Sequence, residues 1–203
     1  MRQVFWSLWR FVGALFVASS TLAHAGVRDM QEVFATLTEA GLMEPFYAIT
    51  SIEPPPSGAR LLEDIILGDH LPYTHAGGDG AGGAFARLAD GALIYISSEG
   101  ETAGLGDSTE EFLVIALSMY GWMDALRFVR ADAEADAKAW AAYRREWNLP
   151  ERPALEAEAI DILALFGLTP LAAPFEHLHA RVSDPSSGVT VRGQHGAYVR
   201  FGQ

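Results

Sequence analysis

The stretch that decides the fold is His70–Leu126, HLPYTHAGGDGAGGAFARLADGALIYISSEGETAGLGDSTEEFLVIALSMYGWMDAL. It begins with a glycine-rich segment, His75–Gly83, which has five glycines in nine residues and is expected to form a loop. Two strand-like runs follow, Ala84–Leu88 and Ala92–Ser97, separated by Ala89-Asp90-Gly91. An Asp-Gly pair between such runs predicts a β-hairpin, because both turn positions favour residues that tolerate positive φ.

The second run of the hairpin is apolar on both of its faces. Side chains alternate along a strand, so a strand with two apolar faces is expected to be buried on both sides and to lie centrally in a sheet. One face would carry Leu93, Tyr95 and Ser97, and the other Ala92, Ile94 and Ile96.

A helix is predicted over Asp107–Trp122. Ser108 and Glu111 have the spacing of a capping box, in which the serine and glutamate side chains satisfy backbone N–H groups at the start of a helix. An apolar stripe at helical spacing then predicts one buried face. It consists of Phe112, Ile115, Met119, Trp122 and Met123.

Further helices and strands flank this stretch. Asp29–Gly41 has an N-cap residue, a helical apolar face and a terminal glycine, and predicts a helix that precedes the core. Residues 131–147 and 154–166 predict two more helices, and a short one is expected near 175–182. The tail, Gly188–Phe201, is expected to form a two-stranded hairpin around Gln194-His195.

Two features of these flanking elements suggested partner contacts. Trp140, Tyr143 and Trp147 share one face of an otherwise polar helix, which could pack on the domain or mediate self-association. Arg192 and Arg200 in the tail form a small basic patch on an acidic protein.

Composition narrows the class of protein. The 203 residues carry a formal net charge of −12, and half of them are apolar, which is ample for a continuous core. Such a charge repels nucleic-acid phosphates and anionic lipid headgroups and favours either solubility or a basic protein partner. The chain has no cysteine, which excludes disulfides, thiolate metal sites and cysteine nucleophiles.

The N-terminus resembles a secretory signal peptide over residues 1–25. Arg2 and Arg10 form a basic region, Phe11–Ser19 is apolar, and Ala23-His24-Ala25 fits a cleavage site. The apolar run is shorter than the roughly 20 residues needed to span a membrane. A periplasmic or secreted protein is expected; a start at Met30 and a cytoplasmic protein is the alternative.

No catalytic constellation emerges from the sequence. Gly78, Gly80 and Gly83 match G-x-G-x-x-G, but strand-like sequence follows them where a dinucleotide site needs a helix, so no cofactor is expected. His70 and His75, with Asp79, form a weak metal-site pattern, and no bound metal is expected. A small exported metal- or ligand-binding protein or enzyme with a site near these three residues remains the alternative.

The candidate partner-binding residues are acidic. They lie in the loops around the hairpin, where they are expected to form a solvated face or a contact surface for a basic partner. They are Asp79, Asp90, Glu99, Glu101 and Asp107.

Several of these segments together resemble the SUKH (Smi/Knr-like) superfamily of bacterial immunity proteins. The resemblance covers roughly Leu61–Arg127. It rests on Leu71-Pro72-Tyr73, the Gly77–Gly83 segment, the two strand-like runs, Ser98-Glu99-Gly100 and the helix from Asp107-Ser108-x-x-Glu111-Phe112-Leu113 to Trp122.

The resemblance implies a mixed sheet wrapped by helices and a protein that neutralises a toxin by binding it. It supplies no catalytic residues, and the matching positions are expected to be structural. These positions are Gly78, Gly80, Gly83, Tyr95, Phe112 and Trp122.

The sequence therefore predicts an α+β protein and a non-enzymatic, protein-binding function. A small, mostly antiparallel sheet packed with helices is expected within residues 26–130. Residues 131–203 are expected to add a helical extension and a C-terminal β-hairpin. The oligomeric state is left open.

Overall fold

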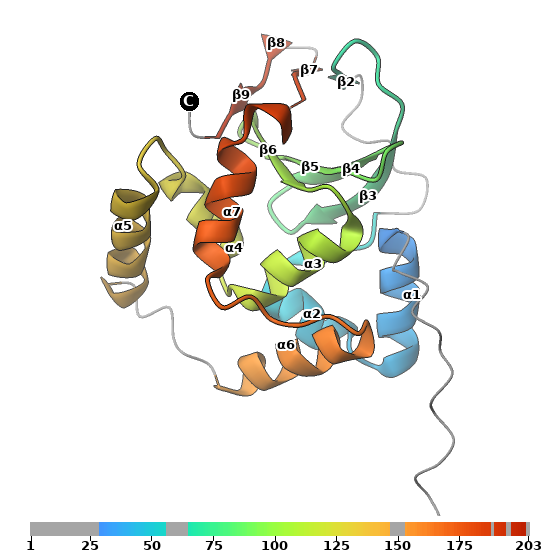
Figure 1. Cartoon of the computed structure of the whole chain (residues 1–203). Coiled ribbons are helices and arrows are strands. Elements are labelled where there is room, and N and C mark those ends of the chain that lie inside the picture. The colour runs from blue at the N-terminus through green and yellow to red at the C-terminus, as the bar shows by residue number, and fades with distance from the viewer. Residues whose placement is uncertain (1–28, 56–64, 147–152, 188, 194–195, 202–203) are drawn as a thin grey trace, which may run out of the picture.

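The computed structural model describes residues 29–55, 65–146, 153–187, 189–193 and 196–201. It is an α+β structure, as predicted, built on a six-stranded sheet of order β1-β3-β4-β5-β6-β9 (Figure 1). The predicted signal peptide, residues 1–25, lies outside the described residues.

Four consecutive antiparallel strands form the centre of this sheet. They are β3 (Tyr73–Asp79), β4 (Ala84–Leu88), β5 (Leu93–Ile96) and β6 (Glu101–Gly106). At the edges, β1 (Ile52–Glu53) pairs antiparallel with β3, and β9 (Val199–Arg200) pairs parallel with β6.

The predicted hairpin is therefore β4–β5, and β5 is buried on both faces as expected. Leu93 and Tyr95 belong to the larger of two apolar clusters, and Ile94 and Ile96 belong to the other. The turn differs from the prediction, because only Gly91 has a positive φ, at 103°. The loop has three residues, Ala89–Gly91, and the Gly91 N–H donates to the Leu88 carbonyl oxygen at 3.0 Å, so only its last residue needs a positive φ.

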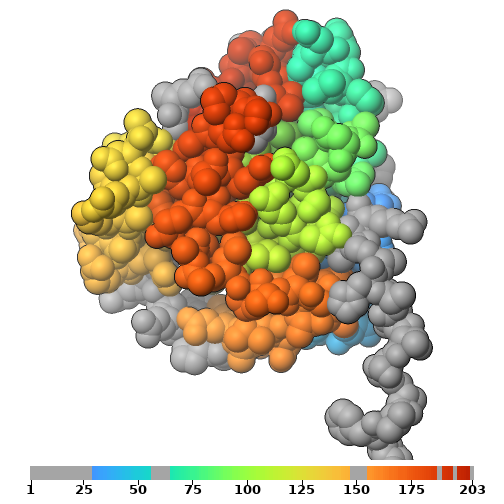
Figure 2. All heavy atoms as spheres, viewed as in Figure 1, coloured from blue at the N-terminus to red at the C-terminus, as the bar shows by residue number. Residues whose placement is uncertain are grey.

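Helices cover one face of the sheet. They are α1 (Met30–Ala40), α2 (Met43–Thr50), α3 (Thr109–Ser118), α4 (Trp122–Ala125), α5 (Ala133–Glu146), α6 (Pro153–Leu165) and α7 (Pro174–Ser183), with 3₁₀ turns η1 (Leu126–Phe128) and η2 (Pro185–Ser187). The α7 helix packs on β6 and α3, and Figure 2 shows it lying between α5 and α3. The α1 helix begins at Asp29, whose side chain caps it, and ends at Gly41, as predicted.

A small second sheet covers the other face. It has the order β2-β7-β8, from β2 (Ile66–Leu67), β7 (Val191–Gly193) and β8 (Gly196–Ala197). Leu67 and Val191 are buried against Ala86, Ile94 and Ile96 of the main sheet. β7 and β8 pair antiparallel on either side of residues 194–195, as predicted, but residues 199–200, which the prediction placed in the same hairpin, form β9 and pair parallel with β6 of the main sheet.

The glycine-rich segment is mostly strand, so the expectation of a loop over His75–Gly83 was wrong. β3 continues to Asp79, and only the residues between Asp79 and Ala84 form the turn. A Cβ added at Gly77 would lie 2.9 Å from the Glu53 carbonyl oxygen of β1. The missing side chain therefore lets an edge strand approach closely, a role that composition alone cannot distinguish from that of a turn.

The predicted helix at Asp107–Trp122 is interrupted. Ser108 caps it as expected, with its Oγ 3.2 Å from the Glu111 N–H, but α3 ends at Ser118 and Gly121, with φ 79°, starts the separate α4. This break directs Trp122 into the core, where its Nε1 donates to the Thr50 carbonyl oxygen at 3.0 Å.

Residues 131–203 contribute side chains to the same large cluster as α1–α4. Trp140 is 4% exposed and packs on Phe128 and Phe175, with ring centroids 5.6 and 6.3 Å away. The predicted aromatic stripe thus packs on the domain at Trp140 and Tyr143, while Trp147 lies outside the described residues.

Candidate functional site

The five candidate acidic residues do not form one surface. Consecutive antiparallel strands reverse direction, so the β3–β4 and β5–β6 turns lie at one end of the sheet and the β4–β5 turn at the other. Asp79, Glu99 and Glu101 belong to the first end, and Asp90 and Asp107 to the second. The sequence places these residues near one another, but the alternation of the strands separates them.

Asp79 is a structural residue, contrary to the expectation that it is solvated. It is 5% exposed. Its Oδ1 accepts hydrogen bonds from the backbone N–H groups of Ala81 and Gly83 at 2.8 and 2.7 Å, and its Oδ2 accepts one from the Tyr95 hydroxyl at 2.6 Å. The carboxylate thus holds the β3–β4 turn and anchors it to β5, and it is not available to a partner.

Gly83 and Tyr95 complete this arrangement. A Cβ at Gly83 would lie 2.4 Å from Asp79 Oδ2 and 2.9 Å from the Tyr95 hydroxyl oxygen, so the pair requires glycine there. Burial, followed by the hydrogen bond to Asp79 and the charges of Glu101 and Glu99, raises the pKa of Tyr95 far above its ordinary value. Tyr95 therefore stays protonated and donates to Asp79.

A groove of about 420 Å³ opens at this same end of the sheet. We call it the acidic groove. Its walls come from both turns, from α2 and from the α4–η1 segment, and include Tyr47, Ser51, Asp79, Gly80, Tyr95, Ser98, Glu99, Glu101, Met123, Asp124, Arg127 and Phe201.

The charged groups of the acidic groove are mostly carboxylates. Among the described residues, no ion pair forms within 4 Å of Glu99, Glu101 or Asp124. Arg127 is the cation that lines the same groove, and it is exposed. Tyr47 adds an aromatic ring that is 43% exposed. Such a surface suits a cation, because carboxylates and an aromatic face both attract positive charge.

Sequence analysis missed the part of this groove that comes from outside the hairpin. Tyr47, Asp124 and Arg127 carry no local motif, and Phe201 reaches the groove from the C-terminus, with its ring centroid 6.4 Å from that of Tyr95. No spacing in the sequence connects these residues to Glu99 and Glu101, since only the packing of α2, α4 and β9 brings them together.

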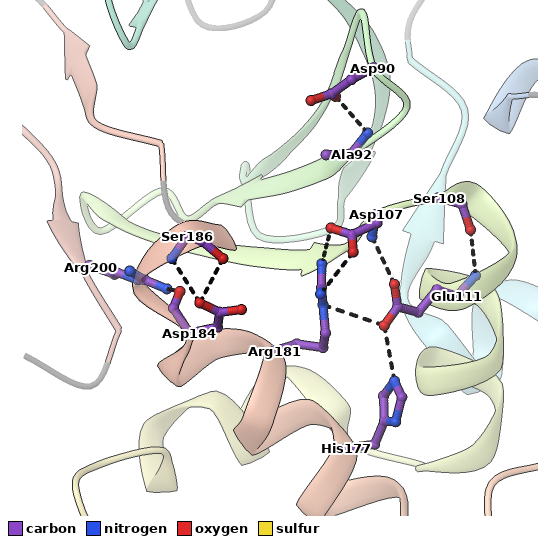
Figure 3. Close-up of polar contacts among 10 residues, drawn as sticks. All are labelled: Asp90, Ala92, Asp107, Ser108, Glu111, His177, Arg181, Asp184, Ser186 and Arg200. Atoms are coloured by element: carbon purple, nitrogen blue, oxygen red, sulfur yellow. Dashed lines mark hydrogen bonds and ion pairs between the residues drawn. The ribbon is translucent and has the colours of Figure 1, made fainter.

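At the opposite end of the sheet, Asp107 and Glu111 share one arginine (Figure 3). Arg181 of α7 donates to both carboxylate oxygens of Asp107, at 3.0 Å from Nη1 to Oδ2, and its Nε lies 3.4 Å from Glu111 Oε1. Glu111 also accepts from the Asp107 N–H at 2.8 Å and contacts His177 Nε2 at 3.1 Å. The hydrogen bond to Asp107 raises the pKa of Arg181, against an opposing effect of burial.

This arrangement assigns Asp107 a structural contact that the sequence did not indicate. It joins the end of β6 and the start of α3 to α7, which lies more than seventy residues further along the chain. Asp90, in the adjacent turn, is exposed and makes its side-chain hydrogen bond to Ala92.

Arg200 is also committed within the fold and does not extend a free basic patch. Its Nη2 donates to the carbonyl oxygens of Val182, at 2.7 Å, and Asp184, near the end of α7. Arg192 is exposed and lies 3.8 Å from the Asp69 carboxylate.

The histidines of the alternative site do not converge. His70 is exposed in the turn after β2, with φ 64°, whereas His75 is partly buried within β3 and Asp79 is committed to Tyr95. Among the residues that the structure describes, no group of three metal-ligating side chains is found. His177 and His179 face different helices, contacting Glu111 and Asp136, in agreement with their spacing.

The other residues that match the SUKH superfamily also have close neighbours within the fold. Phe112 and Trp122 contact each other and Phe85 in the core, with ring centroids 5.5 to 6.0 Å apart. A Cβ at Gly78 would lie 3.4 Å from the Gly83 carbonyl oxygen, and one at Gly80 would lie 2.8 Å from the Tyr47 hydroxyl oxygen.

Comparison with protein-family models, with curated proteins and with solved structures finds no match. Within the described part of the chain, no helix has the length and apolarity needed to cross a membrane.

Proposed function

We propose that this protein is a non-enzymatic binding protein of the toxin-immunity type, and that its acidic groove receives a basic segment of a protein partner. The observation that carries the proposal is the set of carboxylates at Glu99, Glu101 and Asp124, which line one groove without an ion pair among the described residues. The partner would supply the missing positive charges.

Electrostatics supports a basic protein segment as the ligand. The chain carries a net charge of −12, so its field attracts cations over a distance of about one Debye length, roughly 8–10 Å at ordinary ionic strength. Complementary charges of this kind accelerate encounter and select the correct partner. The exposed Tyr47 ring offers a face for a lysine or arginine side chain.

The resemblance to SUKH immunity proteins supports the same class of function. Part of it lies at the groove: Gly80, Tyr95 and Ser98-Glu99 of the β5–β6 turn line it, and Gly83 and Tyr95 hold Asp79 in place. The hydrogen-bonded pair of Asp79 and Tyr95 would hold the β5–β6 turn, with Glu99 and Glu101, in a defined position, which lowers the entropy lost on binding.

Products of the neighbouring genes are the candidate partners for a test. Each is expressed with and without the full chain, growth is measured, and binding of the purified pair is measured by biolayer interferometry at low and high salt. One product is expected to arrest growth, to be neutralised by the chain and to bind it more weakly as salt rises.

A pair of matched double variants locates the binding surface. Glu99→Lys with Glu101→Lys reverses the groove charges and is expected to weaken binding by a hundredfold or more, as an order-of-magnitude estimate for two reversed charge pairs. Glu39→Lys with Glu146→Lys makes the same change of charge in the last turns of α1 and α5, where lysine suits the helix dipole, and is expected to retain binding. Equal binding by both double variants, or no interacting product, would contradict the proposal.

A further inference from the structure

A second pocket lies among the helices, away from the acidic groove. Its volume is about 360 Å³, which is within the range of roughly 300–1,000 Å³ usual for small-molecule sites. Its apolar walls come from α2, α5, α6 and α7, and α3 adds Leu117. The walls include Ile49, Leu117, Trp140, Leu155, Ala159 and Phe175.

The aromatic part of the wall is rigid. Trp140 and Phe175 are 4% and 5% exposed, and their rings stack with centroids 6.3 Å apart and an interplanar angle of 17°. Trp140 also stacks on Tyr143, with ring centroids 5.8 Å apart, so these side chains are held in place and this part of the wall is preformed.

Arg144 provides the polar feature of this pocket. It is half-buried, and its Cζ lies 6.0 Å from the centroid of the Trp140 ring. Its Nε is buried and has no hydrogen-bond partner among the described residues, and no ion pair with a described carboxylate is found. The Nε itself is closed to solvent, so a ligand in the pocket would meet the outer N–H groups of the guanidinium, and an anion there would supply the opposite charge that Arg144 lacks among the described residues.

The start of α7 adds positive potential to the same pocket. Residues 172–176 line it, and Ala173, at the N-cap position, provides no side-chain hydrogen bond to the helix. Pro174, the first residue of α7, has no N–H, so only the N–H groups of Phe175 and Glu176 lack a partner within the helix and favour an anion. The two carboxylates that line the pocket, Glu156 and Glu176, are exposed to solvent, which screens them.

We propose that this pocket binds a small amphipathic carboxylate. The apolar body would lie against Trp140 and Phe175, and the carboxylate would accept hydrogen bonds from Arg144 and from the start of α7. This inference concerns a different part of the molecule from the acidic groove and does not depend on the function proposed there.

Three probes of equal chain length separate charge from apolar contact. Octanoate, octan-1-ol and octylammonium are titrated into the full chain, and the dissociation constants are measured by isothermal titration calorimetry. Octanoate is expected to bind about tenfold more tightly than octan-1-ol, as one charge-assisted hydrogen-bonded contact would give, and octylammonium is expected to bind most weakly. Absence of saturable octanoate binding, or equal binding of all three probes, would overturn the proposal.

Matched variants then test the role of Arg144. Arg144→Gln is expected to weaken octanoate binding about tenfold while leaving octan-1-ol binding unchanged, and Arg144→Lys should retain part of the preference for octanoate. Arg145→Gln makes the same change of charge at the exposed neighbouring residue and should leave octanoate binding as it is. Octanoate binding that is unaffected by Arg144→Gln, or equally weakened by Arg145→Gln, would refute the assignment.

A variant that fills the pocket tests the location of the ligand without changing any charge. Ala141 of α5 lines the pocket and is half-buried, so Ala141→Leu adds volume there with a residue that suits a helix. This variant is expected to weaken binding of both octanoate and octan-1-ol. Unchanged octanoate binding by a folded Ala141→Leu protein would place the ligand elsewhere and overturn the proposal.

Discussion

The two ends of the central sheet use acidic residues in opposite ways. At the β3–β4 end, Asp79 is buried and bonded to Tyr95, and Glu99 and Glu101 line an open groove without an ion pair among the described residues. At the β4–β5 end, Asp107 and Glu111 are both paired with Arg181. Acids in glycine-rich loops near one hairpin are thus a buried anchor, an open surface or half of an ion pair, depending on what packs beside them.

The difference separates stability from binding. The contacts of Asp79 and Arg181 join parts of the fold, so we expect their loss to be measured as a lower free energy of unfolding. The open carboxylates make no such contact, and their loss is expected to affect association. The following predictions test this division at each end of the sheet.

The largest effect on stability is expected for Asp79→Ala. This change leaves the N–H groups of Ala81 and Gly83 and the Tyr95 hydroxyl without their acceptor. An unsatisfied buried group costs about 1–3 kcal/mol, so we expect a loss of roughly 3 kcal/mol or more, measured by urea unfolding. Asp90→Ala, the matched change at the opposite end, removes one exposed hydrogen bond and should cost about 0.5 kcal/mol. Similar losses for the two variants would refute the division.

A second prediction concerns the dependence of stability on pH at the Asp79 end. The pKa of Tyr95 is higher in the folded protein than in the unfolded chain, where it is about 10. The stability that comes from this difference is complete below about pH 10 and is lost as the pH rises above that value. The free energy of unfolding should fall there by up to about 1.4 kcal/mol per pH unit from this group alone.

Tyr95→Phe isolates that contribution from other groups that titrate at high pH. It should lose the hydrogen bond to Asp79, be less stable at neutral pH and show a shallower decline above pH 10 than the unsubstituted protein. Unfolding free energies measured by urea between pH 8 and 11 provide the comparison, and equal slopes would show that Tyr95 ionises as freely in the folded chain as in the unfolded one.

A smaller loss of stability, which depends on salt, is expected at the β4–β5 end of the sheet. Arg181→Met keeps an apolar stem like that of arginine but removes the hydrogen bonds to Asp107 and the ion pair with Glu111. Asp107 is 76% exposed, so solvent screens the pair and the loss should be about 1 kcal/mol at low salt. The difference should shrink in about 1 M salt, where the Debye length is near 3 Å. A salt-independent loss would mean that the packing of the guanidinium group, and not its charge, joins α7 to α3.

The sequence predicted the local elements of the hairpin region because their signals are local. Ser108 caps α3 through a residue three positions away, and Asp29 and Gly41 bound α1 in the same manner. The two apolar faces of β5 were predicted because alternation along a strand depends only on the backbone. The break after α3 was missed, since Gly121 is decisive only because the core has a place for Trp122 beside Thr50.

The candidate site was predictable only in part. Glu99 and Glu101 were identified, whereas Asp79 was assigned to the surface because an aspartate between glycines is usually solvated. Its burial depends on Tyr95, sixteen residues away, and on the absence of a side chain at Gly83. Tyr47 and Asp124 join the groove through contacts between distant segments, which leave no periodic pattern in the sequence.

The sequence by itself thus determined the α+β class, the central hairpin, the capped helices and the excess of acid, since each depends on short-range geometry or on composition. Tertiary structure decided which acid became an anchor, which was paired with Arg181 and which stayed open in a groove. The physical reason is that the state of a carboxylate depends on its nearest donors and on its access to water. In this protein, those donors come from strands and helices far apart in the chain.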